Sequence, residues 1–330
     1  MKKRLAAAGS LSRWLPAVLL VLSLGGCAAL TALDPDEAFS EPPQAVELTD
    51  VPHHPQEALQ CGPAALAAML QWSGHDVAPE TLKPDLFVPA RRGTFQSEIK
   101  AQSRARDRVP YRIPGTHDAI VAELHAGNPV MVFQNLGLGW LPVWHYAVVV
   151  GYKPDNHAYV LRSGEHKRQI TTLDRFRRTW ERGDNWAIVV VRPDELPATA
   201  QPAHWLRAGL DLEETGRASA ARAAYERGRA HWPRHGGFHV ALVNLHHGEG
   251  DARGAAAAAR RGLDEAESLR GVLNNNLAML LLEQGRYADA ENKARAALEV
   301  DSPFTDAFKD TLETICQQRT DGAACDAQAD

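Results

Sequence analysis

The sequence predicts two parts: an α+β domain followed by an all-α domain of helical repeats. An Ala- and Leu-rich helical pattern that begins at Cys61, and an apolar β-branched run that has His145 at its start, predict the first part. Glycines that recur at intervals of 34 and 35 residues predict the second, at Gly216, Gly250 and Gly285. We expect the helical portion with the cysteine to pack against an antiparallel sheet that carries the histidine.

The segment around Cys61 predicts a helix N-terminus. A Pro-broken approach over 51–55 ends at the cysteine, and apolar residues then recur at helical spacing up to Leu70. Gly62-Pro63 suits a first turn, where a missing N–H costs nothing. Free N–H groups and the helix dipole favour a thiolate at such a position. A cysteine nucleophile needs this environment, together with a base and a group that holds the oxyanion.

The base is sought on the apolar run Trp144–Tyr152, which predicts a buried strand. His145 stands where this strand begins, so its side chain can face a cleft. A helix-borne cysteine followed about 85 residues later by a strand-borne histidine is the papain-like order of parts.

Two motifs carry a family resemblance. Gln-x4-Cys-Gly-x-Ala-x-Leu, followed by His-Tyr-x-Val-Val-x-Gly, resembles the double-glycine leader (bacteriocin-processing) cysteine peptidases. The resemblance covers about 48–195. It implies a papain-like α+β fold with Cys61 as nucleophile, His145 as base and Gln56 as an oxyanion-hole donor.

The sequence departs from that family at the residue that orients the histidine. The family usually has an Asp on the next strand, whereas Arg162 or Ser163 falls at that place here. Arginine cannot accept a hydrogen bond from imidazole. Ser163 is therefore the candidate third member. A backbone carbonyl, Glu165, a Cys–His dyad and a non-catalytic relative stay open as alternatives.

The N-terminus predicts a targeting segment. Lys2-Lys3-Arg4 precede an apolar stretch from Leu15 to Leu24 that is too short for a comfortable membrane span. Leu24-Gly25-Gly26-Cys27 resembles a bacterial lipobox, so we expect a signal peptide over 1–26, lipid on Cys27 and a tether over 27–50. The residue after Cys27 is Ala28 and not Asp, which resembles the signal that sorts lipoproteins to the outer membrane. We therefore expect the protein to face the periplasm. An ordinary cleaved signal is the alternative.

Composition excludes some classes of partner. The 330 residues suffice for two domains, and the net charge is −5. Loss of the four positive charges of the leader leaves −9, which argues against nucleic acid. No His or Cys pair has zinc-site spacing, and we expect neither a metal nor a cofactor.

Four cysteines fit an oxidising compartment. With Cys27 lipidated and Cys61 a nucleophile, Cys316 and Cys325 form a candidate disulfide across a small loop in the tail, 316–330. Two free thiols are the alternative.

Other elements complete the domain predicted over 51–195. Strands are expected over 130–133, 159–164 and 186–191, and helices over 95–106, 117–126 and 173–182. A Gly-rich loop over 134–142 leads to His145 and is suited to line a cleft. Trp140 and Trp144 either wall that cleft or belong to the core.

A linker over 196–203 precedes the repeats, which are predicted over 204–315. Five positions after each of the three glycines stands an Ala, and twelve positions after stands Gly228, Gly262 or Ala297. This pattern resembles tetratricopeptide repeats, which bind an extended peptide or helix and so imply a protein partner. An unrelated Ala-rich bundle, or repeats that only brace the first domain, are the alternatives.

Together these features predict a periplasm-facing lipoprotein: a cysteine peptidase that cleaves a peptide or protein substrate, with repeats that dock a partner. A non-catalytic peptide-binding adaptor and an acyl-transfer enzyme are the alternatives.

Overall fold

The strands of the first domain form one antiparallel sheet. A computed structural model of the chain describes residues 44–55, 60–86 and 93–319. Within these residues seven strands pair in the order β2-β7-β3-β4-β5-β6, and β1 pairs with β4. Their bounds are β1 Val46–Glu47, β2 Val109–Arg112, β3 Val130–Asn135, β4 Trp144–Lys153, β5 Ala158–Ser163, β6 His166–Thr172 and β7 Ala187–Val191.

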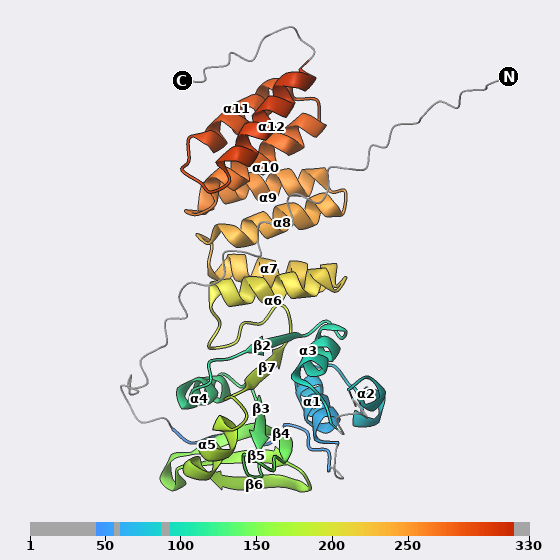
Figure 1. The fold of residues 1–330 in the computed structure, drawn as a ribbon, viewed down its shortest axis with the longest axis vertical. Coiled ribbons are helices and arrows are strands. Elements are labelled where there is room, and N and C mark those ends of the chain that lie inside the picture. The colour runs from blue at the N-terminus through green and yellow to red at the C-terminus, as the bar shows by residue number, and fades with distance from the viewer. Residues whose placement is uncertain (1–43, 56–59, 87–92, 320–330) are drawn as a thin grey trace, which may run out of the picture. The chain divides into compact units, whose positions relative to one another are not determined.

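Helices cover both faces of this sheet. They are α1 Cys61–Trp72, α2 Pro79–Leu86, α3 Gln96–Arg104, α4 His117–His125 and α5 Leu173–Glu181. Figure 1 shows α1, α2 and α3 on one side of the sheet and α4 and α5 on the other. Alternate residues of β4 enter two separate cores: Tyr146 and Val148 pack in the core of α1, whereas Ala147 and Val149 pack in the core of α4. The predicted α+β domain is confirmed.

Two stretches to which the sequence analysis assigned no element contain strands, β2 and β6. Both lie at ends of the sheet, where only one neighbour pairs with them. β2 contains Pro110, which usually argues against a strand, and β6 is mostly polar and exposed. Edge strands therefore lack the apolar signal that identified β3, β4, β5 and β7.

The predicted tether also differs from the structure at its C-terminal end. Val46 pairs with Tyr152 and Glu47 with Gly151, so β1 joins the sheet within the segment assigned to 27–50. A two-residue strand is too short to show periodicity. The leader, Cys27 and the rest of the tether up to 43 lie outside the described residues.

Seven helices follow β7 in the described part of the chain, and each contacts the next. They are α6 Pro202–Glu214, α7 Ala218–His231, α8 Gly236–Gly248, α9 Ala252–Glu265, α10 Arg270–Glu283, α11 Tyr287–Leu298 and α12 Thr305–Gln318. The predicted all-α second part is confirmed.

The three aligned glycines occupy equivalent turns of this helical region. Gly216, Gly250 and Gly285 follow α6, α8 and α10, with φ of +77°, +77° and +70°. This left-handed conformation ends a helix at little cost in glycine. The internal repeat seen in the sequence is thus a repeat of helix, turn and helix.

Small residues let these helices approach closely. At Gly228 of α7, an added Cβ would lie 2.3 Å from the Phe238 ring of α8. The equivalent Gly262 of α9 lies against His239 and Leu273. The twelfth position of the repeat is small because the next helix occupies the space of a side chain.

The junction between sheet and repeats is ordered by a buried carboxylate. Glu123 of α4 is fully buried. It accepts hydrogen bonds from the backbone N–H groups of Ala198 and Thr199, from the Thr199 hydroxyl and from the Asn128 amide. From Pro42 onward the chain forms one compact unit. The boundaries predicted at 195 and 203 stay predictions.

None of the described helices has the length and apolar character that a membrane span requires.

Candidate active site

Cys61 is the first residue of α1. The helix begins with the bond from the Ala64 N–H to the Gln60 carbonyl, at 3.2 Å. Gly62 follows because the Thr94 hydroxyl stands where a side chain would be, 2.5 Å from the position of an added Cβ. The predicted helix start is therefore confirmed, and the thiol is half-buried there.

Backbone N–H groups surround the sulfur of Cys61. Hydrogen bonds from Tyr146, Gly62 and Cys61 itself lower the pKa of the thiol, but burial has the larger effect and raises that pKa overall. The sequence had predicted a helix N-terminus that favours the thiolate. The helix N-terminus is present, yet desolvation outweighs its effect.

The hydrogen bond from Tyr146 brings the thiol beside the histidine strand. Tyr146 directly follows His145 on β4, and its ring reaches back to the α3 segment, where its hydroxyl donates to the Thr94 carbonyl at 3.2 Å. The N-terminal end of α1 therefore lies at the start of β4, the strand that carries His145.

His145 has a polar partner on the next strand. Its Nε2 lies 2.9 Å from the Oγ of Ser163, which ends β5 and is buried. Adjacent strand residues point to opposite faces, so Ser163 and Arg162 cannot both face the imidazole. Of the two residues at the place of the family Asp, Ser163 is the one that contacts His145. Burial lowers the pKa of His145.

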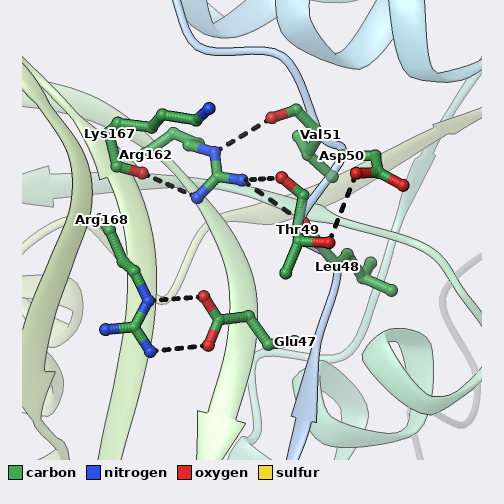
Figure 2. A network of polar contacts seen from close by, with 8 residues as sticks. All are labelled: Glu47, Leu48, Thr49, Asp50, Val51, Arg162, Lys167 and Arg168. Atoms are coloured by element: carbon green, nitrogen blue, oxygen red, sulfur yellow. Dashed lines mark hydrogen bonds and ion pairs between the residues drawn. The ribbon is translucent and has the colours of Figure 1, made fainter.

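Arg162 instead binds the segment 48–51, which precedes Cys61 in the chain. Figure 2 shows its guanidinium among backbone carbonyls. Nε donates to Val51 at 3.0 Å, the two terminal nitrogens donate to Thr49 at 2.8 Å and Lys167 at 2.7 Å, and Leu48 is a longer contact. Arg168 forms a two-pronged ion pair with Glu47 in the same view.

Further contacts continue along the approach. His53 Nε2 donates to the Gly164 carbonyl at 3.1 Å, directly after Ser163. His54 Nε2 lies 2.9 Å from the side-chain oxygen of Gln71 on α1. The approach therefore touches both the strand of Ser163 and the helix of Cys61. Gln56, the predicted oxyanion donor, lies outside the described residues.

A hairpin precedes His145 and was predicted only as a Gly-rich loop. Leu138 and Leu141 pair across its tip. The Asn135 side chain fixes its base, because Oδ1 accepts from the Gly137 and Val143 N–H groups, both at 2.9 Å. Trp140 is 80% exposed and Trp144 51% exposed, so neither is a core residue.

Two hollows lie near Cys61. One, of about 630 Å³, has polar walls that include Gln60, Gln71 and Asp76. The other, of about 350 Å³, is lined by Thr94, Phe95, Gln96, Ser97, Lys100, Phe133 and Tyr146. The described residues contain no group of three or more His, Cys, Asp or Glu that could hold a metal ion.

The tail cysteines are distant in sequence from this site. Cys316 on α12 is disulfide-bonded. Its predicted partner, Cys325, lies outside the described residues, so this pairing stays a prediction.

The comparisons with known proteins agree with the first domain. Residues 48–188 match the sequence profile of the Peptidase_C39 like family. This match supports the resemblance to C39-like peptidases over that part of the chain. No curated protein matches the chain.

Three solved structures are similar to part of the chain. A candidate C39-like peptidase from Bacillus anthracis has 17% identity over 45% of this chain and 98% of its own, with a TM-score of 0.38. Pseudomonas aeruginosa PilF has 21% identity over 36% of this chain and 53% of its own, with a TM-score of 0.33. The Yersinia enterocolitica type III secretion chaperone SycD, solved with a peptide of the translocator YopD, has 18% identity over 34% and 90%, with a TM-score of 0.31.

Proposed function

We propose that this protein is a cysteine peptidase, anchored by lipid on Cys27 at the outer membrane and facing the periplasm. The observation that carries the peptidase proposal is the position of the Cys61 sulfur at the backbone N–H of Tyr146, the residue that follows His145 on β4. The Nε2 of His145 lies against Ser163. The match to the Peptidase_C39 like family supports the same chemistry.

Desolvation favours the neutral forms of Cys61 and His145 at rest. Burial raises the pKa of Cys61 and lowers the pKa of His145, so both shifts disfavour a thiolate–imidazolium pair before substrate binds. With Nε2–H donated to Ser163, the other ring nitrogen of His145 carries a lone pair and can act as a base. Proton transfer then accompanies attack on the substrate.

The reaction follows from these roles. Cys61 Sγ attacks the peptide carbonyl carbon as His145 Nδ1 takes the thiol proton. The C–N bond breaks as that proton passes to the leaving amine, which leaves an acyl thioester on Cys61. His145 next deprotonates a water molecule, whose oxygen attacks the thioester and releases the sulfur. Gln56 and the Cys61 N–H are the proposed oxyanion donors, each worth about 3 kcal/mol in related sites.

We propose that the helical region is a set of tetratricopeptide-like repeats that docks a protein partner. The equivalent helix-ending glycines and the buried small residues support this proposal. The lipid anchor rests on the sequence around Cys27 alone.

The test of the peptidase proposal is inactivation by a peptidyl fluoromethyl ketone, in which the C–S bond forms as fluoride leaves. We would use a soluble form that begins at Ala28, which keeps the whole compact unit from Pro42 onward. Inactivation that requires both Cys61 and His145, and that is lost in Cys61→Ala and His145→Ala, is the expected result. Peptide libraries would then reveal cleavage.

The adaptor alternative is favoured by a specific observation, the neutral Ser163 in place of a carboxylate. If the fluoromethyl ketone alkylates Cys61 no faster than it alkylates free cysteine, and at the same rate in His145→Ala, the peptidase proposal is overturned in favour of this alternative. A thioester intermediate that passes its acyl group to added amines instead of water would identify an acyl-transfer enzyme.

A further inference from the structure

The hollow of about 350 Å³ is lined by two residues that contact the start of α1, Thr94 and Tyr146. Tyr146 lines it and also supplies the N–H that reaches the Cys61 sulfur. Thr94 lines it too, and stands against Gly62, the second residue of α1. The hollow therefore lies close to the start of α1, where Cys61 stands.

Aromatic rings form the apolar wall of this hollow. Phe133 lies 4.7 Å from Tyr146 between ring centroids, and Trp144 stacks on the other side of Phe133 at 5.0 Å, nearly parallel. Phe95 also lines the hollow and is 41% exposed. Lys100 is the one charged residue among those that line the hollow.

Exposed apolar residues also occupy the hairpin that follows Phe133. Leu136, Leu138, Trp140, Leu141, Val143 and Trp144 are all at least half exposed. The segment 133–144 contains no charged residue. Large apolar residues that remain exposed in one continuous patch commonly mark a binding site.

We infer that this hollow is a specificity subsite that accepts one large apolar side chain, aromatic or Leu-like, next to the scissile bond of an extended peptide, with the 133–144 hairpin as a platform for neighbouring apolar residues. The inference rests on the proposed peptidase function and names its substrate class. A volume of about 350 Å³ is at the small end for ligand pockets, which suits one side chain better than a folded partner.

Continuity with the nucleophile favours a peptide over a membrane as the occupant. Tyr146 lines the hollow, and its backbone N–H reaches the Cys61 thiol. The hollow therefore lies near the place where the substrate bond would react. A surface that only inserts into lipid needs the exposed hairpin tip and has no use for the walled hollow behind it.

The test measures binding without catalysis. The soluble Cys61→Ala form is titrated with fluorescein-labelled octapeptides of Gly, Ser and Ala, in which one position in turn carries Phe, Leu, Gly or Asp. We expect the best Phe or Leu peptide to bind at least about tenfold more tightly than its Gly and Asp counterparts. Equal binding across the four, or a preference for Asp, would overturn the inference.

Two pairs of variants locate the preference. Ser97 is exposed at the rim, so Ser97→Trp fills the hollow without disturbing the core and should reduce the preference to less than about threefold, whereas Ser97→Ala retains it. Trp144→Ala should weaken Phe binding. Ile170→Ala, at a residue 49% exposed on β6, is the matched control and should change nothing.

Other outcomes are separable. If the apolar preference persists in Cys61→Ala while the wild-type thiol fails to react with fluoromethyl ketones, the subsite stands and the peptidase proposal fails. If the fluoromethyl ketones react but the preference is absent, only the subsite fails. Co-sedimentation of the soluble form with phosphatidylcholine–phosphatidylglycerol vesicles, lost in Trp140→Ser and without any peptide preference, would overturn the inference in favour of a membrane contact.

Discussion

The imidazole of His145 lies 2.9 Å from the hydroxyl of Ser163, at the place where related peptidases carry a carboxylate. A hydroxyl can orient the ring through one hydrogen bond, but it brings no negative charge to stabilise an imidazolium. The candidate base of this protein is therefore oriented by hydrogen bonding alone at this position, and its pKa is lowered by burial.

Removal of that hydroxyl should slow the reaction moderately. One neutral hydrogen bond contributes about 0.5–1.5 kcal/mol, so Ser163→Ala should reduce the rate of reaction with a peptidyl fluoromethyl ketone about two- to twelvefold. The substitution Ser163→Thr keeps the hydroxyl and serves as the control. An unchanged rate in the alanine variant would show that Ser163 does not position the base.

The pH dependence of the same reaction should reveal the base. His145 must be neutral to accept the thiol proton, and its pKa is lowered from the ordinary 6.5. Activity should therefore persist on acidification past pH 6.5 and fall only as the pH passes through that lowered value. In Ser163→Asp a new carboxylate beside the ring raises the pKa of His145, so the acid limb should move to higher pH. A wild-type acid limb above pH 7 would contradict this expectation.

The Arg162 clamp should contribute to stability. Arg162 is only 5% exposed, and its guanidinium donates to carbonyls of the 49–51 segment and of β6. Arg162→Lys cannot reach three carbonyls in fixed directions, so we expect a loss of about 2–3 kcal/mol in the free energy of unfolding, measured in urea. Lys167→Arg, at an exposed neighbour, is the control. A loss under about 0.5 kcal/mol would mean that water replaces the clamp.

The free energy of unfolding should be equally sensitive to replacement of the Glu123 carboxylate. Glu123→Gln keeps the shape but turns an amide NH₂ toward donors of the 198–199 segment, which leaves buried donors without an acceptor. A loss of about 2–3 kcal/mol in the free energy of unfolding is expected. Glu226→Gln, on the exposed face of α7, should cost little. Equal stability of both variants would show that the junction tolerates the change.

Two glycines of the helical region, Gly228 and Gly248, allow the close packing of the helices to be tested with the same substitution. Gly228→Ala places a Cβ against the Phe238 ring and should cost about 1–3 kcal/mol by overpacking. Gly248→Ala, near the end of α8, meets nothing within 4 Å and should be neutral or slightly stabilising. Thermal unfolding by circular dichroism would distinguish the two. If Gly228→Ala were neutral, α7 and α8 would not pack as closely as described.

Local pattern in the sequence was sufficient for much of this architecture. The helix from Cys61, the strand after His145 and the glycine-terminated helix pairs were predictable, because burial imposes a period of 3.6 or 2 on apolar residues and left-handed turns select glycine. Edge strands such as β2 and β6 were missed, because residues with one pairing partner and a solvated side need not be apolar.

Only the tertiary structure decided the partners of the chemical groups. The sequence favoured Ser163 over Arg162 as the partner of His145 but left a backbone carbonyl, Glu165 and a dyad open. The structure places Ser163 at His145, and the alternation of β5 places Arg162 at the segment that leads to Cys61. The sequence also predicted a thiolate from the helix N-terminus, whereas burial raises the pKa of that thiol. Desolvation depends on what packs around a group from distant parts of the chain, and periodicity along the chain carries no record of it.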